Sequence, residues 1–217
     1  MRPFGVFGGM FDPVHFGHLR TAHELCELLD LEAVAFVPAG DPPHRAAPLA
    51  DTATRLAMLR AAIGDDPRFL VDDRELRRGG PSYTVLTLQE LRAERGDQPI
   101  VLIMGMDAYV GIDQWHRAGD LLTLAHIVVA LRPHASLPAG GLAGRLLRER
   151  RAAGAAQLAT LPAGLVHVSD NTQLDLSSSA VRAVVVAGRD PRYLMPDAVR
   201  RIILGTGSYA RPGETKE

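Results

Sequence analysis

The chain alternates short, continuous apolar runs with longer segments in which apolar residues recur every three or four positions. Continuous runs are typical of strands buried on both faces of a parallel sheet, and the periodic segments are typical of amphipathic helices. The predicted strands are 4–7, 33–37, 68–71, 100–104, 126–131 and 165–168. Strands that alternate with helices and show no linker predict an α/β fold, a doubly wound parallel sheet with helices on both faces. Its ligands should lie beyond the carboxyl ends of the strands.

The first half of the chain contains three predicted helices with an apolar face. They cover residues 17–29, a segment that Thr52 is predicted to cap, and residues 84 to about 96. In the second of these, Leu56, Leu59 and Ile63 should face inward. All three helices follow predicted strands or loops, as a doubly wound sheet requires.

The second half of the chain has weaker signals. Helices are predicted over 142–153 and at the serine-rich start 176–182, and Pro196 and Gly205 are predicted to bracket the last helix. The polar residues after 205 are expected to form a frayed tail, 206–217. The predicted organisation is therefore one domain over 1–205, with a small C-terminal helical portion.

The first strand–helix junction is rich in glycine and histidine. It reads Gly8-Gly9-Met10-Phe11-Asp12-Pro13-Val14-His15-Phe16-Gly17-His18-Leu19. Glycines let the backbone approach an anion, a helix N-terminus directs N–H groups at it, and histidines add donors. The junction is suited to holding phosphate and indicates nucleotide transfer.

His15 and His18 have three competing interpretations. They are phosphate donors, a metal-binding pair, or ordinary core and capping histidines. A zinc site needs a third and a fourth ligand at recognisable spacing, and the sequence offers no such cluster. The neighbouring glycines instead leave room for an anion, so phosphate donors are favoured and no protein-held metal is expected.

Composition limits the partners and the compartment. The 217 residues carry a net charge of -1, so a basic surface for nucleic acid or acidic membranes is not expected. No apolar run approaches a membrane span, and the N-terminus lacks the pattern of a signal peptide, which predicts a cytoplasmic protein. The single cysteine, Cys26, excludes an internal disulfide framework and is expected to be a buried helix residue.

Lys216 is the only lysine, and all other basic residues apart from histidine are arginines. Chemistry through a lysyl adduct or Schiff base needs a lysine whose pKa burial can lower. A lysine in the last two positions cannot readily serve, so such chemistry is close to excluded.

The junction resembles the signature of the nucleotidylyltransferase superfamily, in particular that of the bacterial nicotinate-nucleotide adenylyltransferases. The resemblance covers about residues 4–204, with 132–162 as the poorly matched part. Its further motifs are Pro42-Pro43-His44-Arg45, Pro81-Ser82-Tyr83-Thr84, Gly105-x-Asp107 with Trp115, Ser177-Ser178-Ser179-x-x-Arg182 and Tyr193-Leu194-Met195-Pro196.

The resemblance implies a Rossmann-like fold and adenylyl transfer from ATP to nicotinate mononucleotide, with nicotinate adenine dinucleotide and pyrophosphate as products of a step in NAD biosynthesis. The acceptor phosphate would attack the α-phosphorus directly, without a covalent enzyme intermediate, and Mg²⁺ would be carried by the ATP phosphates. The enzyme would mainly align the reactants and neutralise charge.

The resemblance also implies site residues. As catalytic residues it implies His15, His18 and Arg182. As ATP contacts it implies Gly8, Gly9, Phe11, His18, Gly105, Asp107, Ser178, Ser179 and Arg182. As contacts to nicotinate mononucleotide it implies His15, His44, Arg45, Tyr83, Thr84 and Trp115. Each has a plainer alternative: the serines cap a helix, the loop pair is solvated, and the only tryptophan is a core residue. Asp12 is expected to orient the turn rather than act as a base.

Two positions depart from the family pattern: Met10 and Ser179 stand where threonine is usual. Rival interpretations are another acceptor, such as nicotinamide mononucleotide, phosphopantetheine or glycerol phosphate, a fragment of a class I aminoacyl-tRNA synthetase, and a non-catalytic nucleotide sensor. The lack of a lysine-containing loop argues against the synthetase, and intact His15, His18 and Arg182 argue against the sensor. The sequence leaves a homo-oligomer open.

Overall fold

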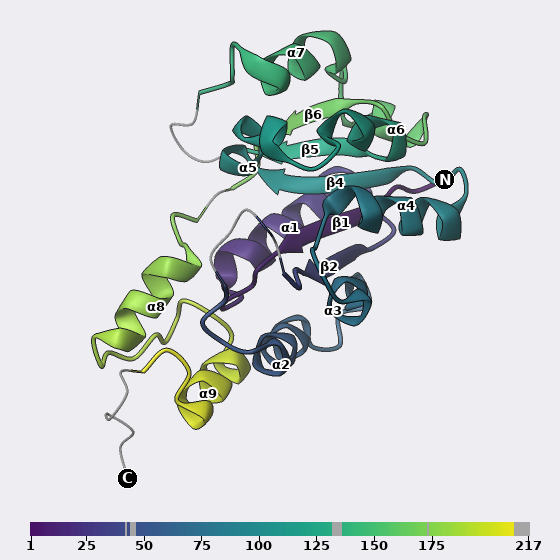
Figure 1. Ribbon diagram of the computed structural model, residues 1–217. Coiled ribbons are helices and arrows are strands. Elements are labelled where there is room, and N and C mark those ends of the chain that lie inside the picture. The colour runs from purple at the N-terminus through teal and green to yellow at the C-terminus, as the bar shows by residue number, and fades with distance from the viewer. Residues whose placement is uncertain (42, 44–46, 132–135, 173, 211–217) are drawn as a thin grey trace.

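A single six-stranded sheet forms the centre of the computed structural model, which describes residues 1–41, 43, 47–131, 136–172 and 174–210 (Figure 1). The strands are β1 (Phe4–Gly9), β2 (Val34–Pro38), β3 (Phe69–Val71), β4 (Ile100–Gly105), β5 (His126–Ala130) and β6 (Val166–Ser169). Their order is β3-β2-β1-β4-β5-β6 and every pairing is parallel. This confirms the predicted α/β fold.

Helices cover both faces of the sheet. They are α1 (Phe16–Leu28), α2 (Thr52–Ile63), α3 (Arg74–Arg78), α4 (Thr84–Arg95), α5 (Met106–Val110), α6 (Leu121–Leu124), α7 (Gly141–Arg150), α8 (Ser178–Val186) and α9 (Asp197–Thr206), with short 3₁₀ turns η1 (Ile112–Gln114), η2 (Ala118–Asp120) and η3 (Ala155–Ala159). Alternate residues of β2 separate the two cores: Val34 and Phe36 pack with α1, α2 and α9, whereas Ala35 and Val37 pack with α4, α6 and α7. Burial on both faces explains the continuous apolar runs.

The strand order reverses between β1 and β4. The chain builds outward from β1 to β3 and then crosses back to β4, where Phe7 pairs with Ile103 near the carboxyl ends. A reversal of this kind opens a crevice at the strand ends. After β6 the chain returns to this region, where α8 and α9 lie beyond the end of β1 and α9 packs against α2 (Figure 1). These two helices are the small C-terminal portion expected from the sequence.

The start of α2 corrects one prediction. Asp51, not Thr52, is the N-cap residue, because its carboxylate accepts the Thr54 N–H at 2.7 Å. A carboxylate is a strong N-cap acceptor and directly preceded the predicted start. Leu59 is buried as predicted and Ile63 packs against the core, whereas Leu56 is not among the buried residues and Met58 and Arg55 are.

The end of α9 corrects a second prediction. Pro196 is the N-cap residue as predicted, but Gly205 lies inside the helix, and Gly207, with φ 65°, ends it. The left-handed conformation at the C-cap is one that glycine adopts without strain. The segment predicted as a frayed tail is ordered at its start, because Tyr209 is buried. Residues 211–217 lie outside the described part of the chain.

Two further features limit what the fold can do. Within the described ranges, no helix has the length and hydrophobicity that a membrane crossing requires. Cys26 is buried in α1, as predicted, and burial raises the pKa of its thiol. A thiol held in its protonated form is a poor nucleophile, so Cys26 is a packing residue.

Candidate active site

Two glycines open the space above the ends of β1 and β4. A Cβ atom at Gly8 or at Gly105 would meet no other atom within 4 Å, and neither residue has a positive φ. Neither packing nor backbone conformation therefore requires glycine at these two positions. Close approach of a ligand to the backbone is the remaining physical reason, and the reversal point of the sheet is where such a ligand binds.

Other glycines of the motif make room for its own side chains. A Cβ at Gly9 would lie 3.0 Å from the Phe11 ring, and one at Gly17 would lie 2.9 Å from Nδ1 of His15. The Phe11 ring is 1 % exposed and packs at 5.7 Å from the ring of Phe36. Phe11 was predicted to contact ATP, but its side chain belongs to the core, so only its backbone can reach a ligand.

The two motif histidines stack on each other at the start of α1. Their ring centroids are 3.8 Å apart with an angle of 29° between the planes, and the His15 ring is 4 % exposed. The His15 N–H donates to Nδ1 of His18 at 3.3 Å, which assigns the proton of a neutral His18 ring to Nε2. The motif thus orients His18 as a donor through Nε2.

The N-terminus of α1 offers fewer open N–H groups than expected. The Phe16 N–H donates to the Leu194 carbonyl at 3.0 Å, and the His18 N–H donates to the His15 carbonyl. The expectation that this helix start directs its N–H groups at phosphate is therefore wrong in part. The contact of Phe16 with Leu194 ties the segment between α8 and α9 to the motif.

Asp12 orients the turn, in agreement with its predicted role. Its carboxylate accepts the N–H groups of Leu49 and Ala50 at 2.8 and 3.1 Å, and it also accepts the Tyr209 hydroxyl. A carboxylate occupied by three donors is poorly placed to remove a proton from a substrate. The loop between β1 and α1, residues 10–15, is called the motif loop. These hydrogen bonds tie it to the segment that enters α2.

A buried arginine of α2 also binds the motif loop. Arg55 is 0 % exposed, and its Nη1 donates to the carbonyls of Met10 and Ala39, both at 2.9 Å. Burial lowers the pKa of Arg55 and the Asp12 carboxylate opposes this effect. Sequence reasoning missed Arg55, although its spacing from Met58 and Leu59 places it on the buried face of α2. Arg55 joins the ends of β1 and β2.

The start of α8 lies directly on the motif loop. Ser177 caps the helix by accepting the Ala180 N–H at 3.1 Å, and the Ser178 hydroxyl donates to the Pro13 carbonyl at 2.9 Å. Arg182 donates through Nη1 to the Asp12 carbonyl at 2.7 Å and through Nη2 to Oγ of Ser179 at 3.1 Å. Two segments about 165 residues apart in the sequence thus form one site, and both contain predicted phosphate-binding residues.

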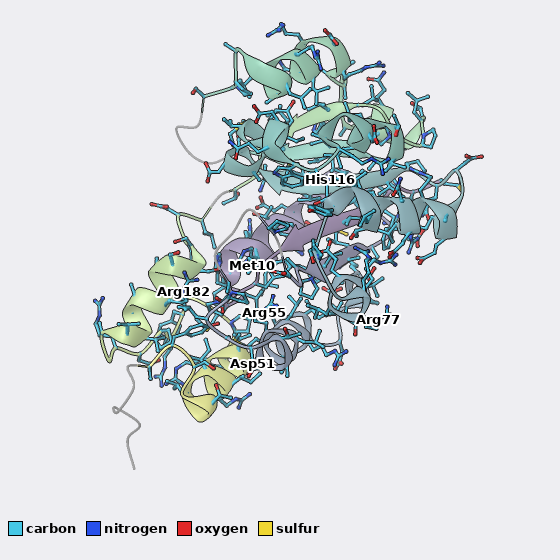
Figure 2. All side chains as sticks on the ribbon, viewed as in Figure 1. Met10, Asp51, Arg55, Arg77, His116 and Arg182 are labelled. Atoms are coloured by element: carbon cyan, nitrogen blue, oxygen red, sulfur yellow. The ribbon has the colours of Figure 1, made fainter. Side chains whose placement is uncertain are left out.

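Three of the residues predicted to bind the acceptor lie on the other side of the strand ends, whereas His15 lies beside His18 at the start of α1. Tyr83 is the N-cap residue of α4, Thr84 begins that helix, and Trp115 follows η1. The ring of His116 lies 4.3 Å from that of Tyr83 with 31° between the planes. Sequence reasoning missed His116, although it directly follows Trp115. Figure 2 shows His116 near β4 and α5, on the opposite side of Met10 from Arg182.

Trp115 combines the two interpretations that the sequence left open. It is half-buried and packs against the core on the α4 side of the sheet, so part of the ring is structural. The remaining surface lies on the same side of the molecule as Tyr83, which packs against the same core. An aromatic ring fixed on one face and accessible on another can stack on a flat ligand.

A polar network holds the start of α4 in place. Together, Tyr83, Thr84, Trp115 and His116 are called the acceptor side. Oγ of Ser82 accepts the Gly40 and Asp41 N–H groups at 2.9 and 3.2 Å. The buried Glu75 carboxylate accepts the Thr87 hydroxyl at 2.6 Å, and burial raises the pKa of Glu75. These contacts fix the residues on both sides of Tyr83, where α4 begins.

Three predicted contacts are less defined. His44 and Arg45 lie outside the described residues. Asp107 is exposed in the first turn of α5, two residues after Gly105. In the described part of the chain, no three His, Cys, Asp or Glu side chains gather in a way that could hold a metal ion.

An open groove of about 470 Å³ lies on a different face of α1. It is lined mainly by apolar side chains, among them Phe16, Leu19, Leu176 and Tyr193. None of the residues predicted to contact ATP or the acceptor lines it. The residues predicted to form the site therefore lie apart from this groove.

Comparisons with known proteins identify the family and the fold. The chain matches the cytidylyltransferase-like family over residues 6–184. It is 45% identical over 208 residues to a Methylococcus capsulatus protein named "Probable nicotinate-nucleotide adenylyltransferase", a match that covers 95% of this chain and 99% of the relative. A protein of the same name from Marinobacter nauticus is 46% identical, with 96% of this chain and 98% of the relative covered.

A solved structure shares the fold. The nicotinic acid mononucleotide adenylyltransferase of Plasmodium falciparum, complexed with NaAD, superposes with a TM-score of 0.74 at 14% identity and covers 96% of this chain and 98% of its own. Identity this low supports the fold alone, whereas the bacterial relatives define the family. The chain belongs to the nicotinate-nucleotide adenylyltransferases, a family of nucleotidyltransferase enzymes within the cytidylyltransferase-like proteins.

Proposed function

We propose that this protein transfers the adenylyl group of ATP to nicotinate mononucleotide and releases nicotinate adenine dinucleotide and pyrophosphate. The observation that carries the proposal is the convergence of Arg182 and the stacked pair of His15 and His18 on one loop at the reversal point of the sheet. The names of the bacterial relatives support this substrate pair.

The reaction proceeds in one in-line displacement. An oxygen of the acceptor's 5′-phosphate forms a bond to the α-phosphorus of ATP, and the bond from that phosphorus to the bridging oxygen breaks, so pyrophosphate leaves with the electron pair. Both reactants are already ionised, and the protein therefore needs to align them and to neutralise charge. Arginine and histidine donors suffice, and the chain has no lysine before Lys216 that could form a covalent adduct.

The donor side holds the ATP phosphates. His18 donates to a phosphoryl oxygen through Nε2, and Arg182 presents the rest of its guanidinium beside it. The Ser178 hydroxyl already donates to the Pro13 carbonyl, so the main-chain N–H groups of Ser178 and Ser179 at the start of α8 take the anion. The open space above Gly8 and Gly105 receives the nucleoside.

Magnesium enters this proposal as part of the substrate, bound to the ATP phosphates. The described residues include no carboxylate cluster that could hold the ion independently. Removal of Mg²⁺ with a chelator should abolish pyrophosphate release, and added Mg²⁺ should restore it without any change in the melting temperature of the ligand-free protein.

The acceptor side recognises the pyridine ring. Trp115 and Tyr83 offer flat surfaces for stacking, and the start of α4 at Thr84 offers N–H groups to the carboxylate. His44 and Arg45 complete the predicted acceptor contacts from a loop that lies outside the described residues. Nicotinamide lacks the carboxylate charge, so the amide form should be the poorer acceptor.

An acceptor panel tests the proposal. Purified protein with ATP and Mg²⁺ is offered nicotinate mononucleotide, nicotinamide mononucleotide, phosphopantetheine and glycerol phosphate, and pyrophosphate release is measured. We expect rapid release with nicotinate mononucleotide and much slower release with nicotinamide mononucleotide. Equal rates with these two, or release only with another acceptor, would overturn the substrate assignment.

Single-turnover labelling tests the absence of a covalent intermediate. ATP labelled at the α-phosphorus is mixed with nicotinate mononucleotide, Mg²⁺ and excess protein, the reaction is quenched at short times, and label on the denatured protein is measured. Label should pass from ATP to the dinucleotide only. A protein-bound adenylyl group that forms and decays at the rate of turnover would replace the direct displacement by a two-step mechanism.

A further inference from the structure

A tyrosine from the C-terminal segment reaches the motif loop. Tyr209 lies three residues beyond the end of α9 and is 9 % exposed. Its hydroxyl donates to Oδ1 of Asp12 at 2.6 Å, across 197 positions of the sequence. Burial and the neighbouring carboxylate both raise the pKa of Tyr209, so the phenol stays protonated and remains a donor at neutral pH.

The backbone around Tyr209 is shaped to bring the ring to this position. Gly207 ends α9 with φ 65°, and Tyr209 itself has φ 69°, in the left-handed region that bulky residues rarely adopt. The Ala210 N–H donates to the Gly207 carbonyl at 3.1 Å and closes the turn. The ring then packs in the core that α1, α2 and α9 share. The same φ at Tyr193 leaves that residue 83 % exposed, so it is the burial of Tyr209 and its hydrogen bond, not the backbone conformation, that distinguish this ring.

Asp12 connects this tyrosine to Arg182. The carboxylate of Asp12 accepts the Tyr209 hydroxyl, and the main-chain carbonyl of the same residue accepts Nη1 of Arg182 at 2.7 Å. Nη1 also lies 4.0 Å from Oδ2 of Asp12. The residue whose side chain the C-terminal segment holds in place is therefore the residue whose carbonyl orients the guanidinium.

Two backbone donors alone leave the Asp12 side chain less constrained. The Leu49 and Ala50 N–H groups bind it from the segment that enters α2. Tyr209 approaches from a separate part of the chain and completes the fixation of the carboxylate. Without this hydroxyl, Asp12 keeps its partners on one side only, and the loop that supplies the Arg182 acceptor gains freedom.

We propose that Tyr209 is a positioning residue for adenylyl transfer, whose hydroxyl fixes Asp12 and, through the Asp12 carbonyl, the guanidinium of Arg182. The expected effect on kcat rests on the proposed function. The fixed position of the guanidinium rests on the hydrogen bonds alone. Tyr209 does not touch substrate. The C-terminal segment thus takes part in the site although it follows every motif predicted from the sequence.

The kinetic test compares Tyr209→Phe with Tyr193→Phe. Tyr193 also has φ 69°, but its side chain is 83 % exposed, so it is a matched control for loss of a tyrosine hydroxyl. Tyr209→Phe should lower kcat about tenfold, since small misplacement of a catalytic group affects the rate more than binding. The KM values for ATP and acceptor should change less than about twofold. An unchanged kcat with a lower melting temperature would reduce Tyr209 to a packing residue.

A double-mutant cycle tests the connection to Arg182. In an Arg182→Lys background the guanidinium is absent, so Tyr209→Phe should produce little further loss of kcat. If the second substitution again lowers kcat about tenfold, the two residues act independently and the proposed connection is wrong. Should Tyr209→Phe fail to fold, Asp12→Asn replaces it in the same cycle and is expected to show the same non-additivity with Arg182→Lys.

A spectroscopic readout separates this proposal from the proposed function. In ¹⁵N spectra of the ligand-free full chain, the Arg182 side-chain signal is assigned by its absence from Arg182→Lys. It should shift in Tyr209→Phe and stay in place in Tyr193→Phe. An unshifted signal overturns the proposal even if the enzyme uses nicotinate mononucleotide, and a shifted signal supports it even if the acceptor panel fails.

Discussion

The donor and acceptor sides of the site are built differently. On the donor side, Arg182, Ser178 and His18 are tied to the motif loop by hydrogen bonds between 2.7 and 3.3 Å. On the acceptor side, Tyr83 and His116 meet through a ring contact at 4.3 Å, and their support comes from residues beneath them. The donor side is therefore held in place by hydrogen bonds before any ligand binds, whereas the acceptor side offers the surfaces of aromatic rings.

This difference matches the work that the proposed function gives to each side. Charge gathers on the transferring phosphoryl group whatever the acceptor, so its donors gain from being fixed before the substrate arrives. The acceptor must be selected among similar nucleotides, and ring stacking with a few donors provides that selection. Substitutions on the donor side should therefore lower kcat, and substitutions on the acceptor side should raise the KM of the acceptor.

The largest effect is expected from His18→Ala. The substitution removes the Nε2 donor that the His15 N–H orients. Loss of one preorganised donor to a developing oxyanion lowers kcat by about 10²- to 10³-fold. Steady-state pyrophosphate release should show this loss with little change in KM. His23→Ala, on the same helix but outside the motif, is the control and should keep kcat.

A second large effect is expected from Arg182→Lys. Lysine keeps the charge but cannot donate to the Asp12 carbonyl and to Ser179 at once while facing a phosphate. We expect kcat to fall about 10²-fold, less than for complete loss of a donor because the charge remains. Arg189→Lys, the same substitution at an exposed residue just after the end of α8, is the matched control. Full activity in the lysine variant would show that charge alone is sufficient.

A smaller and different effect is expected from Trp115→Ala. Loss of ring stacking should raise the KM for nicotinate mononucleotide about five- to tenfold, which corresponds to about 1 kcal/mol of aromatic contact. Binding of ATP should be nearly intact because the donor side lies across the strand ends. Separate titrations of the two substrates measure this. An unchanged acceptor KM, or an equal rise for ATP, would contradict the division into two sides.

His116 sharpens the same comparison at a residue that the sequence did not suggest. Its ring packs against that of Tyr83, so His116→Ala should also raise the acceptor KM, by about two- to fivefold, while kcat at saturating acceptor is unchanged. The variant His116→Phe preserves a flat ring and should recover most of the affinity. A loss that phenylalanine does not recover would assign the effect to the imidazole donors instead of to stacking.

Much of the fold could be predicted because strands buried on both faces form continuous apolar runs. Those runs located β2, β4 and β5 to within about a residue at each end. Ends that depend on one side chain were less predictable. Asp51 and Thr52 are both good caps, and only the geometry of the Thr54 N–H distinguishes them. Gly205 and Gly207 are both plausible stops, but only Gly207 adopts the left-handed conformation.

Candidate site residues could be predicted where they lie within a motif and not where they depend on long-range contacts. The motif identified His15 and His18, and the serine-rich cap identified Arg182. Tyr209 could not be found in this way, because a tyrosine in a polar C-terminal segment carries no periodic or motif signal. Its role depends on a hydrogen bond that forms only when the two ends of the chain meet.

The smallest expected effect concerns the support of the acceptor side. Burial raises the pKa of Glu75 above its ordinary value of 4.5, so the folded state binds its proton more tightly than the unfolded state. The stabilisation from this residue is therefore complete below pH 4.5 and is lost as pH rises through the folded-state pKa. Glu75→Gln cannot ionise, and its amide oxygen can still accept the Thr87 hydroxyl.

The melting temperature of Glu75→Gln relative to wild type should accordingly increase between pH 4 and pH 7. We expect a relative change of no more than about 4 °C, which is what 1 kcal/mol produces in a domain of this size. Other carboxylates titrate in both proteins and cancel in the difference. Glu149→Gln, exposed on α7, is the control for the loss of a carboxylate. If the melting-temperature difference for Glu75→Gln does not change with pH, the folded state does not favour the protonated form of Glu75. The surroundings of Glu75 would then be more hydrated than its burial indicates.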